Sequence, residues 1–88
     1  MISTNYIITA AEGMHARPAT TLVRLAKNFK STVSLKKGDK IVKLNSLLNI
    51  LSLMIKGRDT ISIIVEGDDE ADAAAAIDLF FKEQLKGL

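Results

Sequence analysis

The chain has 88 residues, of which 48% are hydrophobic and 25% are charged, and it has no cysteine and a formal net charge of +2. This length suits one domain over residues 1–88, and a chain without cysteine has neither disulfides nor thiolate metal ligands. The N-terminal residues lack the basic start of a signal peptide, and no segment has the roughly 18 apolar residues of a membrane span. We therefore expect a cytoplasmic protein that neither inserts into a membrane nor requires a cofactor or a metal ion.

The charges are distributed unevenly along the chain. Residues 13–58 contain ten lysines and arginines but a single acidic residue, Asp39, whereas six of the ten acidic residues lie within residues 66–78. A basic face can attract nucleic acid or steer an acidic protein partner, and it can also be an ordinary solvated surface. Aromatic residues that could stack on bases are scarce, with one tyrosine and no tryptophan, so we expect no nucleic-acid partner.

Seven elements are predicted in the order β-α-β-β-α-β-α. Helices that cover one face of a largely antiparallel sheet would bury the apolar positions of these elements, which indicates an α+β fold in two layers. In chain order the segments are residues 3–9, 16–29, 32–37, 40–44, 47–54, 59–67 and 68–88.

The first four elements follow from local patterns. β-Branched residues indicate the first strand, and apolar residues at steps of three and four indicate the first helix. Pro18 is tolerated only in the first turn of a helix, so this helix begins within a residue or two of His15. The next two segments predict a hairpin that turns at Gly38 and Asp39.

The remaining elements are a short helix, a strand and a long helix. Ser46 precedes the short helix as an N-cap, and Gly57 lies near its end. The strand that follows is β-branched and mostly apolar, which predicts a central position in the sheet. Asp69 and Asp72 predict a cap for the last helix. Its predicted buried stripe consists of Ala74, Ile77, Phe81 and Leu85.

His15 is the only histidine, and it lies at the predicted helix start with Ala16 and Arg17. Helix N-termini present unpaired N–H groups and a partial positive charge, which bind anions and keep a nearby imidazole neutral. A phosphoryl group on the ring would lie beside the N–H groups of Ala16 and Arg17, and a guanidinium matches phosphate oxygens. These residues suit a covalent phosphoryl carrier. They also suit a histidine that only caps the helix beside an ordinary surface arginine, and local chemistry alone does not decide between the two.

The stretch GMHARPAT, residues 13–20, resembles the active-site motif of HPr, the histidine-containing phosphocarrier family of the bacterial phosphoenolpyruvate-dependent sugar phosphotransferase system. The likeness continues through KLNSLLNILSLMIKG and TISIIVEGDDEADA and covers essentially all 88 residues. It implies an open-faced β-sandwich, in which a four-stranded antiparallel sheet of order 1-4-2-3 carries three helices.

The resemblance also implies a function. His15 would accept a phosphoryl group on Nδ1 from phosphorylated enzyme I and pass it to a histidine of an enzyme IIA domain, for sugar uptake. Arg17 would contact the phosphoryl oxygens, with the backbone N–H of Ala16 beside them. The protein would be phosphorylated transiently and would have no turnover of its own.

Ser46 matches the second phosphorylation site of the family, which an HPr kinase/phosphorylase modifies and a catabolite-control transcription regulator reads. The same serine suits a purely structural N-cap, and the two roles are compatible. Many relatives have glycine where Asn49 and Met54 stand here. We expect these two differences to affect regulator contacts and to leave the histidine chemistry intact.

The short helix has too many apolar residues for one buried face, so we expect some of them to be exposed and to contact partners. The alternative is that they form a core beneath a loop. The expected partner contacts are Leu47, Leu48, Leu51, Thr20, Arg24 and Lys27.

Two other classes of function are compatible with the sequence. A non-catalytic regulatory relative would bind a transcription factor through phosphorylated Ser46, although such a role needs no imidazole at His15. A small basic nucleic-acid module is the other class, and the scarcity of aromatic residues argues against it.

Overall fold

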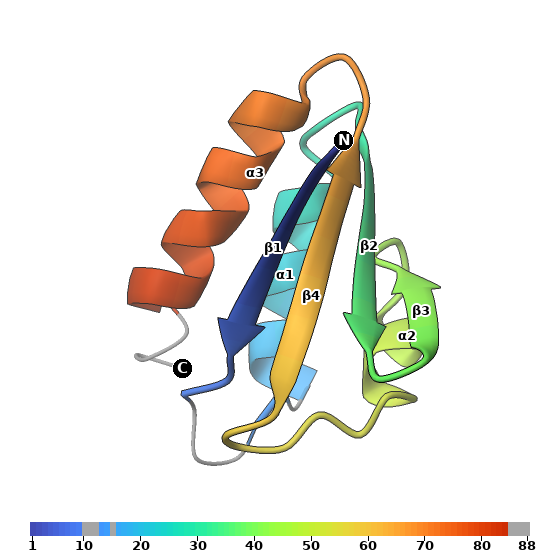
Figure 1. Ribbon diagram of the computed structural model, residues 1–88, viewed down its shortest axis with the longest axis vertical. Coiled ribbons are helices and arrows are strands. Elements are labelled where there is room, and N and C mark those ends of the chain that lie inside the picture. The colour runs from blue at the N-terminus through green and yellow to red at the C-terminus, as the bar shows by residue number, and fades with distance from the viewer. Residues whose placement is uncertain (10–12, 15, 85–88) are drawn as a thin grey trace.

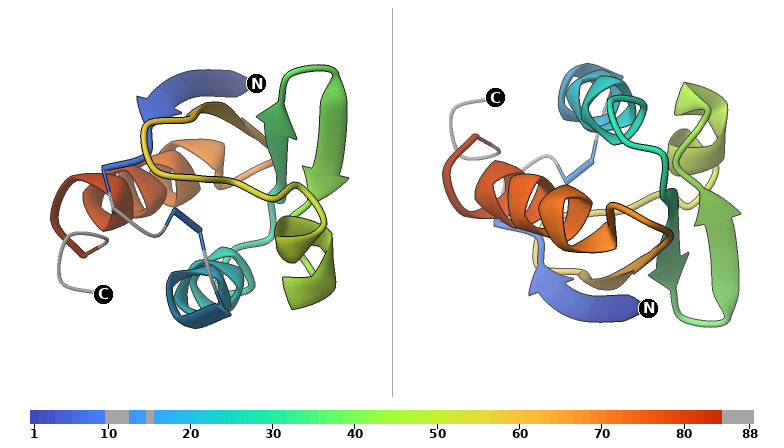
Figure 2. Two further views of the ribbon diagram at one scale, coloured as in Figure 1. Left: turned by 90° about the horizontal axis from the view of Figure 1, so that it is seen from below. Right: turned by 90° about the horizontal axis from the view of Figure 1, so that it is seen from above.

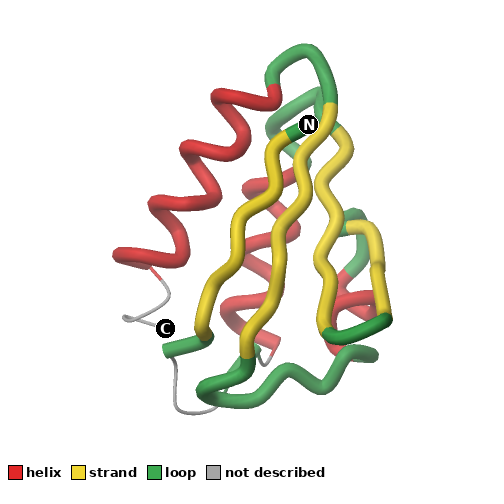
Figure 3. The backbone as a smooth tube through the Cα atoms, in the orientation of Figure 1, coloured by secondary structure: helices red, strands yellow, loops and turns green. Residues whose placement is uncertain are grey.

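The computed structural model describes residues 1–9, 13, 14 and 16–84. Four strands form one antiparallel sheet in the order β1-β4-β2-β3, and the helices cover one face of it (Figures 1 and 3). This arrangement confirms the predicted class, the element order and the strand order. The elements are β1 (Ile2–Ile7), α1 (Ala16–Ala26), β2 (Thr32–Lys37), β3 (Lys40–Lys43), α2 (Leu47–Leu51), β4 (Thr60–Glu66), α3 (Glu70–Leu79) and a π-helical turn η1 (Phe80–Gln84).

Strand β4 lies at the centre of the sheet, as predicted, with β1 on one side and β2 on the other. Its buried residues alternate with half-buried or exposed ones, because successive side chains of a strand point to opposite faces. Ile61, Ile63 and Val65 point toward the helices and belong to the main hydrophobic core. The opposite face of the sheet has no helical cover among the described residues (Figure 2).

Strand β1 ends at Ile7, two residues earlier than predicted, because the ladder is interrupted by a bulge. The N–H of Ile8 donates to the carbonyl of Asp59 at 2.8 Å, and the N–H of Arg58 donates to the carbonyl of Ile8 at 2.8 Å. Arg58 and Asp59 therefore both lie opposite the single residue Ile8, which is the arrangement of a β-bulge. Arg58 has a φ of 73°, in the left-handed region that few non-glycine residues adopt.

Helices α1 and α2 each end three residues before the predicted position, and β3 ends one residue before it. Beyond α1, the N–H of Phe29 donates to the carbonyl of Ala26, three residues back, so the last turn is tighter than an α-helix. Phe29 nevertheless packs, half-buried, against the core. Beyond α2, Met54 adopts a φ of 51°, which terminates the helix.

The two predicted helix caps stand at the right positions but do not act as caps. Ser46 and Asp69 are the N-cap residues of α2 and α3, and neither side chain makes a capping hydrogen bond. The carboxylate of Asp69 instead accepts hydrogen bonds from the N–H groups of Lys30 and Ser31, both at 2.8 Å, and from the hydroxyl of Ser31. Asp69 thus joins the start of α3 to the loop between α1 and β2.

The buried side of the last helix differs from the predicted stripe. Ala73, Ile77, Phe80 and Phe81 are buried, whereas Ala74 is half-buried, and Leu85 lies outside the described residues. The wider π-helical turn brings two consecutive aromatic residues to the core, which a regular helical period does not predict.

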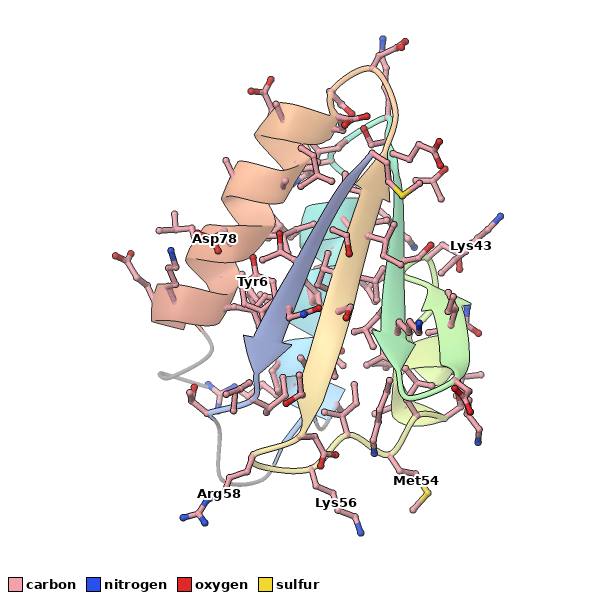
Figure 4. All side chains as sticks on the ribbon, viewed as in Figure 1. Tyr6, Lys43, Met54, Lys56, Arg58 and Asp78 are labelled. Carbon is pink, nitrogen blue, oxygen red and sulfur yellow. The ribbon has the colours of Figure 1, made fainter. Side chains whose placement is uncertain are left out.

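Tyr6 ties this last turn to the edge strand β1. The ring of Tyr6 stacks on that of Phe81 with centroids 4.3 Å apart, and its hydroxyl donates to Asp78 at 2.8 Å (Figure 4). Burial, and then the bond to Asp78, raise the pKa of Tyr6 well above its ordinary value. Throughout the described part of the chain, no helix combines the length and the apolar character needed to cross a membrane.

The chain on both sides of the segment 9–12 is attached to the residues that precede β4. On one side, Ile8 pairs with Arg58 and Asp59 in the bulge. On the other side, the N–H of Met14 donates to the carbonyl of Ile55 at 3.1 Å, and Met14 is buried. The residues before β4 therefore support the chain that leads into α1.

Replacing Asp69 with asparagine should lower the melting temperature by about 5 °C at about pH 7, because bonds to an ionised acceptor are lost. Hydrogen bonds from Ser31 and Lys30 hold the pKa of Asp69 below its ordinary value of 3.8. The stabilisation is therefore complete above that value and is lost as the pH falls through the lower, folded-state pKa. Thermal melts of the native protein and Asp69→Asn should accordingly converge in strong acid.

The control for this comparison is Asp68→Asn, which removes the same charge from an exposed neighbour. An equal loss of stability in the two variants would contradict a specific role for the carboxylate of Asp69.

Gly13→Ala should lower the free energy of unfolding by about 2 to 3 kcal/mol. A Cβ at Gly13 would lie 2.2 Å from the carbonyl oxygen of Ile55, and Gly13 has a φ of 71°. Gly38→Ala is the matched control, because Gly38 has a φ of 61° but no atom of the described residues lies within 4 Å of an added Cβ. Gly38→Ala should lower the free energy of unfolding by only about 1 kcal/mol, because only the backbone is strained. Urea denaturation measures both losses, and equal losses would refute the importance of the close approach.

Candidate functional site

The candidate site lies at the N-terminus of α1. Helix α1 begins at Ala16, directly after His15, which itself lies outside the described residues. Ala16 and Arg17 are exposed, and Pro18 is buried in the first turn, where a missing N–H costs no hydrogen bond. The helix start predicted from Pro18 is therefore confirmed, and the first N–H groups of α1 have no acceptor within the helix.

Two threonine hydroxyls bond to carbonyl oxygens of the first turn of α1. The hydroxyl of Thr20 donates to the carbonyl of Ala16 at 2.7 Å, and that of Thr21 donates to the carbonyl of Arg17 at 3.2 Å. These bonds use carbonyl oxygens and leave the N–H groups of the first turn available to an anion. Thr20, which was expected at a partner contact, is half-buried.

The electrostatics of α1 favour an anion at its start. The first turn contains no acidic residue, and Arg17 contributes a permanent positive charge to it. Arg24 and Lys27 are exposed further along the same helix. The structure therefore brings together a helix N-terminus and a basic helix surface, as the sequence predicted.

Helix α2 lies beside α1 on the same face of the sheet (Figure 2). Its residue Ile50 is buried, Leu48 is 75% exposed, and Leu47 and Leu51 are half-buried against the core. Met54, just beyond the helix, is 69% exposed. We call Leu47, Leu48, Leu51 and Met54 the α2 patch. The expectation that some apolar residues of this segment are exposed is confirmed, most clearly for Leu48.

Ser46 is half-buried at the beginning of α2, with an extended backbone. The attachment of this helix end to β3 comes from Asn49 instead. The side-chain N–H₂ of Asn49 donates to the carbonyl of Lys43 at 3.1 Å and to the side-chain oxygen of Asn45 at 3.3 Å. The sequence analysis noted Asn49 only as a position where many relatives have glycine, and it missed this structural role.

Sequence reasoning also missed Lys37 and Asp59. The ammonium of Lys37 donates to the carbonyls of Leu53 and Met54 and forms an ion pair with Asp59 at 3.0 Å. The N–H of Lys56, and then Lys37, lower the pKa of Asp59. The available signal was the alternation along β2, which turns Lys37 to the same side as the buried residues Val33 and Leu35.

The whole chain is similar to known phosphocarriers. The family of the PTS HPr component phosphorylation site matches residues 2–83. A histidine-containing phosphocarrier protein from a mycoplasma is 31% identical, with a TM-score of 0.91 and 96% of both chains covered. An HPr from Thermoanaerobacter tengcongensis is 30% identical, with a TM-score of 0.92, and the similarity covers 98% of this chain and 97% of that one.

A third similar structure is Crh, a catabolite repression protein of Bacillus subtilis. It is 28% identical, with a TM-score of 0.75, and the similarity covers 96% of this chain and 97% of that chain. The family match covers residues 2–83, and the strand order β1-β4-β2-β3 is the one that the resemblance to this family implied. The chain belongs to the HPr family, the phosphocarrier proteins of the phosphotransferase system.

Proposed function

We propose that this protein accepts a phosphoryl group on Nδ1 of His15 from phosphorylated enzyme I and passes it to enzyme IIA domains for sugar uptake. The observation that carries the proposal is the start of α1 at Ala16. Because the helix begins there, its unpaired N–H groups directly follow His15 in the chain. Family membership supports the carrier role, and the motif GMHARPAT supports the choice of residue.

Each neighbour of His15 has a distinct part in this proposal. The N–H groups of Ala16 and Arg17 donate to the phosphoryl oxygens, and the guanidinium of Arg17 neutralises their charge. The partial positive charge of the helix start keeps the imidazole neutral, so that a ring nitrogen is a nucleophile near neutral pH. The exposure of Ala16 and Arg17 supports access by a partner.

The protein acts as a carrier without turnover of its own, in the cytoplasm, as one domain over residues 1–88. A partner that closes over the helix start excludes water and completes the charge stabilisation of transfer. The α2 patch supplies apolar contacts, and Arg24 and Lys27 supply a charged rim that steers acidic partners. The position of α2 beside α1 supports this shared docking surface.

The central prediction is that the protein gains one phosphoryl group when it is incubated with phosphoenolpyruvate and enzyme I. Intact-mass spectrometry before and after acid treatment should show that the label is acid-labile, as expected for an N–P bond. His15→Ala should take no label. Equal labelling of native protein and His15→Ala would refute the assignment of the nucleophile.

Arg17→Ala serves as the companion variant in this assay. It should remain folded and still take the label, but about a hundredfold more slowly, because one charged donor to the developing phosphoryl charge is missing. Labelling at the native rate would show that Arg17 does not stabilise the phosphoryl group during transfer.

We further propose that Ser46 is a regulatory phosphorylation site, modified by an HPr kinase/phosphorylase and read by a catabolite-control regulator. The likeness to Crh, a catabolite repression protein, supports this regulatory role. The lack of a capping bond from Ser46 also supports it, because modification of the hydroxyl then removes no such bond. A phosphate would add about two negative charges beside the α2 patch.

Ser46→Asp, a mimic of phosphoserine, should weaken phosphoryl acceptance from enzyme I by about tenfold and leave the melting temperature nearly unchanged. The physical reason is repulsion and desolvation at the docking surface rather than any effect on folding. Steady-state transfer kinetics and thermal melts measure the two effects. Ser46→Asn is the uncharged control, and an equal effect of both substitutions would show that charge is not the cause.

A further inference from the structure

We propose that Lys37 and Asp59 are positioning residues for phosphoryl transfer, because together they hold the segment on which both the docking helix and the chain leading to His15 rest. The segment is residues 53–59, between α2 and β4, which we call the support segment (Figure 1). The inference depends on the proposed function for the reaction that it affects, but not for the structural coupling that it describes.

Lys37 holds the first half of the support segment. Its Nζ lies 3.2 Å from the carbonyl oxygen of Leu53 and 2.9 Å from that of Met54. Met54 has a positive φ, which is unfavourable for a residue with a side chain, and its own side chain is largely exposed and contributes little burial. The bonds from Lys37 stabilise the turn that ends α2 and therefore the orientation of the α2 patch.

Asp59 holds the second half of the same segment. Its Oδ2 lies 3.0 Å from Nζ of Lys37 and accepts the N–H of Lys56 at 2.7 Å. The side chains of Lys37 and Asp59 are each only 30% exposed, in contrast with Lys82, which is 69% exposed in its pair with Asp78. Partial shielding from water makes this pair stronger than an ordinary surface ion pair.

The support segment in turn holds the chain that precedes α1 from two directions. Asp59 and Arg58 bond to the backbone of Ile8, while Ile55 accepts the N–H of Met14, the residue before His15. Gly13 packs so closely on Ile55 that no side chain fits there. Met54, Lys56 and Arg58 point outward from this segment (Figure 4), so its inner backbone provides these contacts.

These contacts form one continuous path from the β2–β3 hairpin to the residue before His15. Phosphoryl transfer between two histidines requires close alignment, and a misplacement of about 1 Å can reduce a rate by about a hundredfold. Loss of the Lys37–Asp59 pair should therefore loosen Met14 and Ile8 and slow transfer even when the partner is bound. A merely stabilising pair would lower the melting temperature without selective loosening at these two positions.

The test compares Lys37→Met with Lys36→Met, which removes a lysine from the adjacent, exposed position on the opposite face of β2. Amide hydrogen exchange should accelerate at Met14 and Ile8 in Lys37→Met about tenfold more than at Ile63 in the central strand, and Lys36→Met should leave all three unchanged. With phosphorylated enzyme I as the donor, the transfer rate at saturating carrier should fall about tenfold in Lys37→Met only.

Two further variants complete the test. Asp59→Asn should reproduce both effects and carries the test if Lys37→Met does not fold, whereas Lys37→Arg, which keeps a cationic donor, should recover most of the native rate. Unchanged exchange at Met14, or a change confined to KM, would overturn the inference. A native protein that takes no phosphoryl group would refute the proposed function instead, and the exchange experiment would still decide whether the coupling exists.

Discussion

The close approach of Gly13 and Met14 to Ile55 is the contact on which the arrangement of the candidate site depends. It joins the chain just before α1 to the segment before the central strand β4, which has partners on both sides. A helix start can bind an anion only where the chain entering it leaves the first N–H groups accessible. Because this entry is attached to the segment that leads directly into the central strand, the fold restrains the position of the exposed helix start.

The uneven charge of the chain has a structural counterpart. Several acidic residues near α3 bond within the fold: Asp69 to the loop after α1, Asp78 to Tyr6, and Glu70 to the N–H of Gly67 at 3.3 Å. Much of the acidic cluster in the sequence therefore serves to attach α3. Arg17 and Arg24 on α1, and Lys27 just after it, are exposed, so the positive charge of this part of the chain faces the solvent.

The helical side of the molecule combines the exposed start of α1 with the exposed apolar side chains of the α2 segment. Neither α1 nor the short α2 provides both features, and the two helices contact each other directly on one face of the sheet. In the proposed function this division has an advantage, because docking affinity can then be adjusted on α2 without altering the groups at the start of α1. The support segment contacts both the end of α2 and the chain before α1, and so connects the two regions structurally.

Local periodicity, Pro18 and a family motif were enough to predict the class, the order of the elements, the start of α1 and the candidate residues. Element ends were less predictable: the bulge at Ile8, the left-handed Met54 and the π-helical turn at Phe80–Gln84 depend on neighbours distant in sequence. Likewise, Asp69 resembled a helix cap but bonds across the fold to Ser31. The alternation along β2 places Lys37 on the buried side, but its bonds to Leu53, Met54 and Asp59 become apparent only in the folded chain. The reason is that a hydrogen bond between residues far apart in the sequence leaves no local pattern that names the partner.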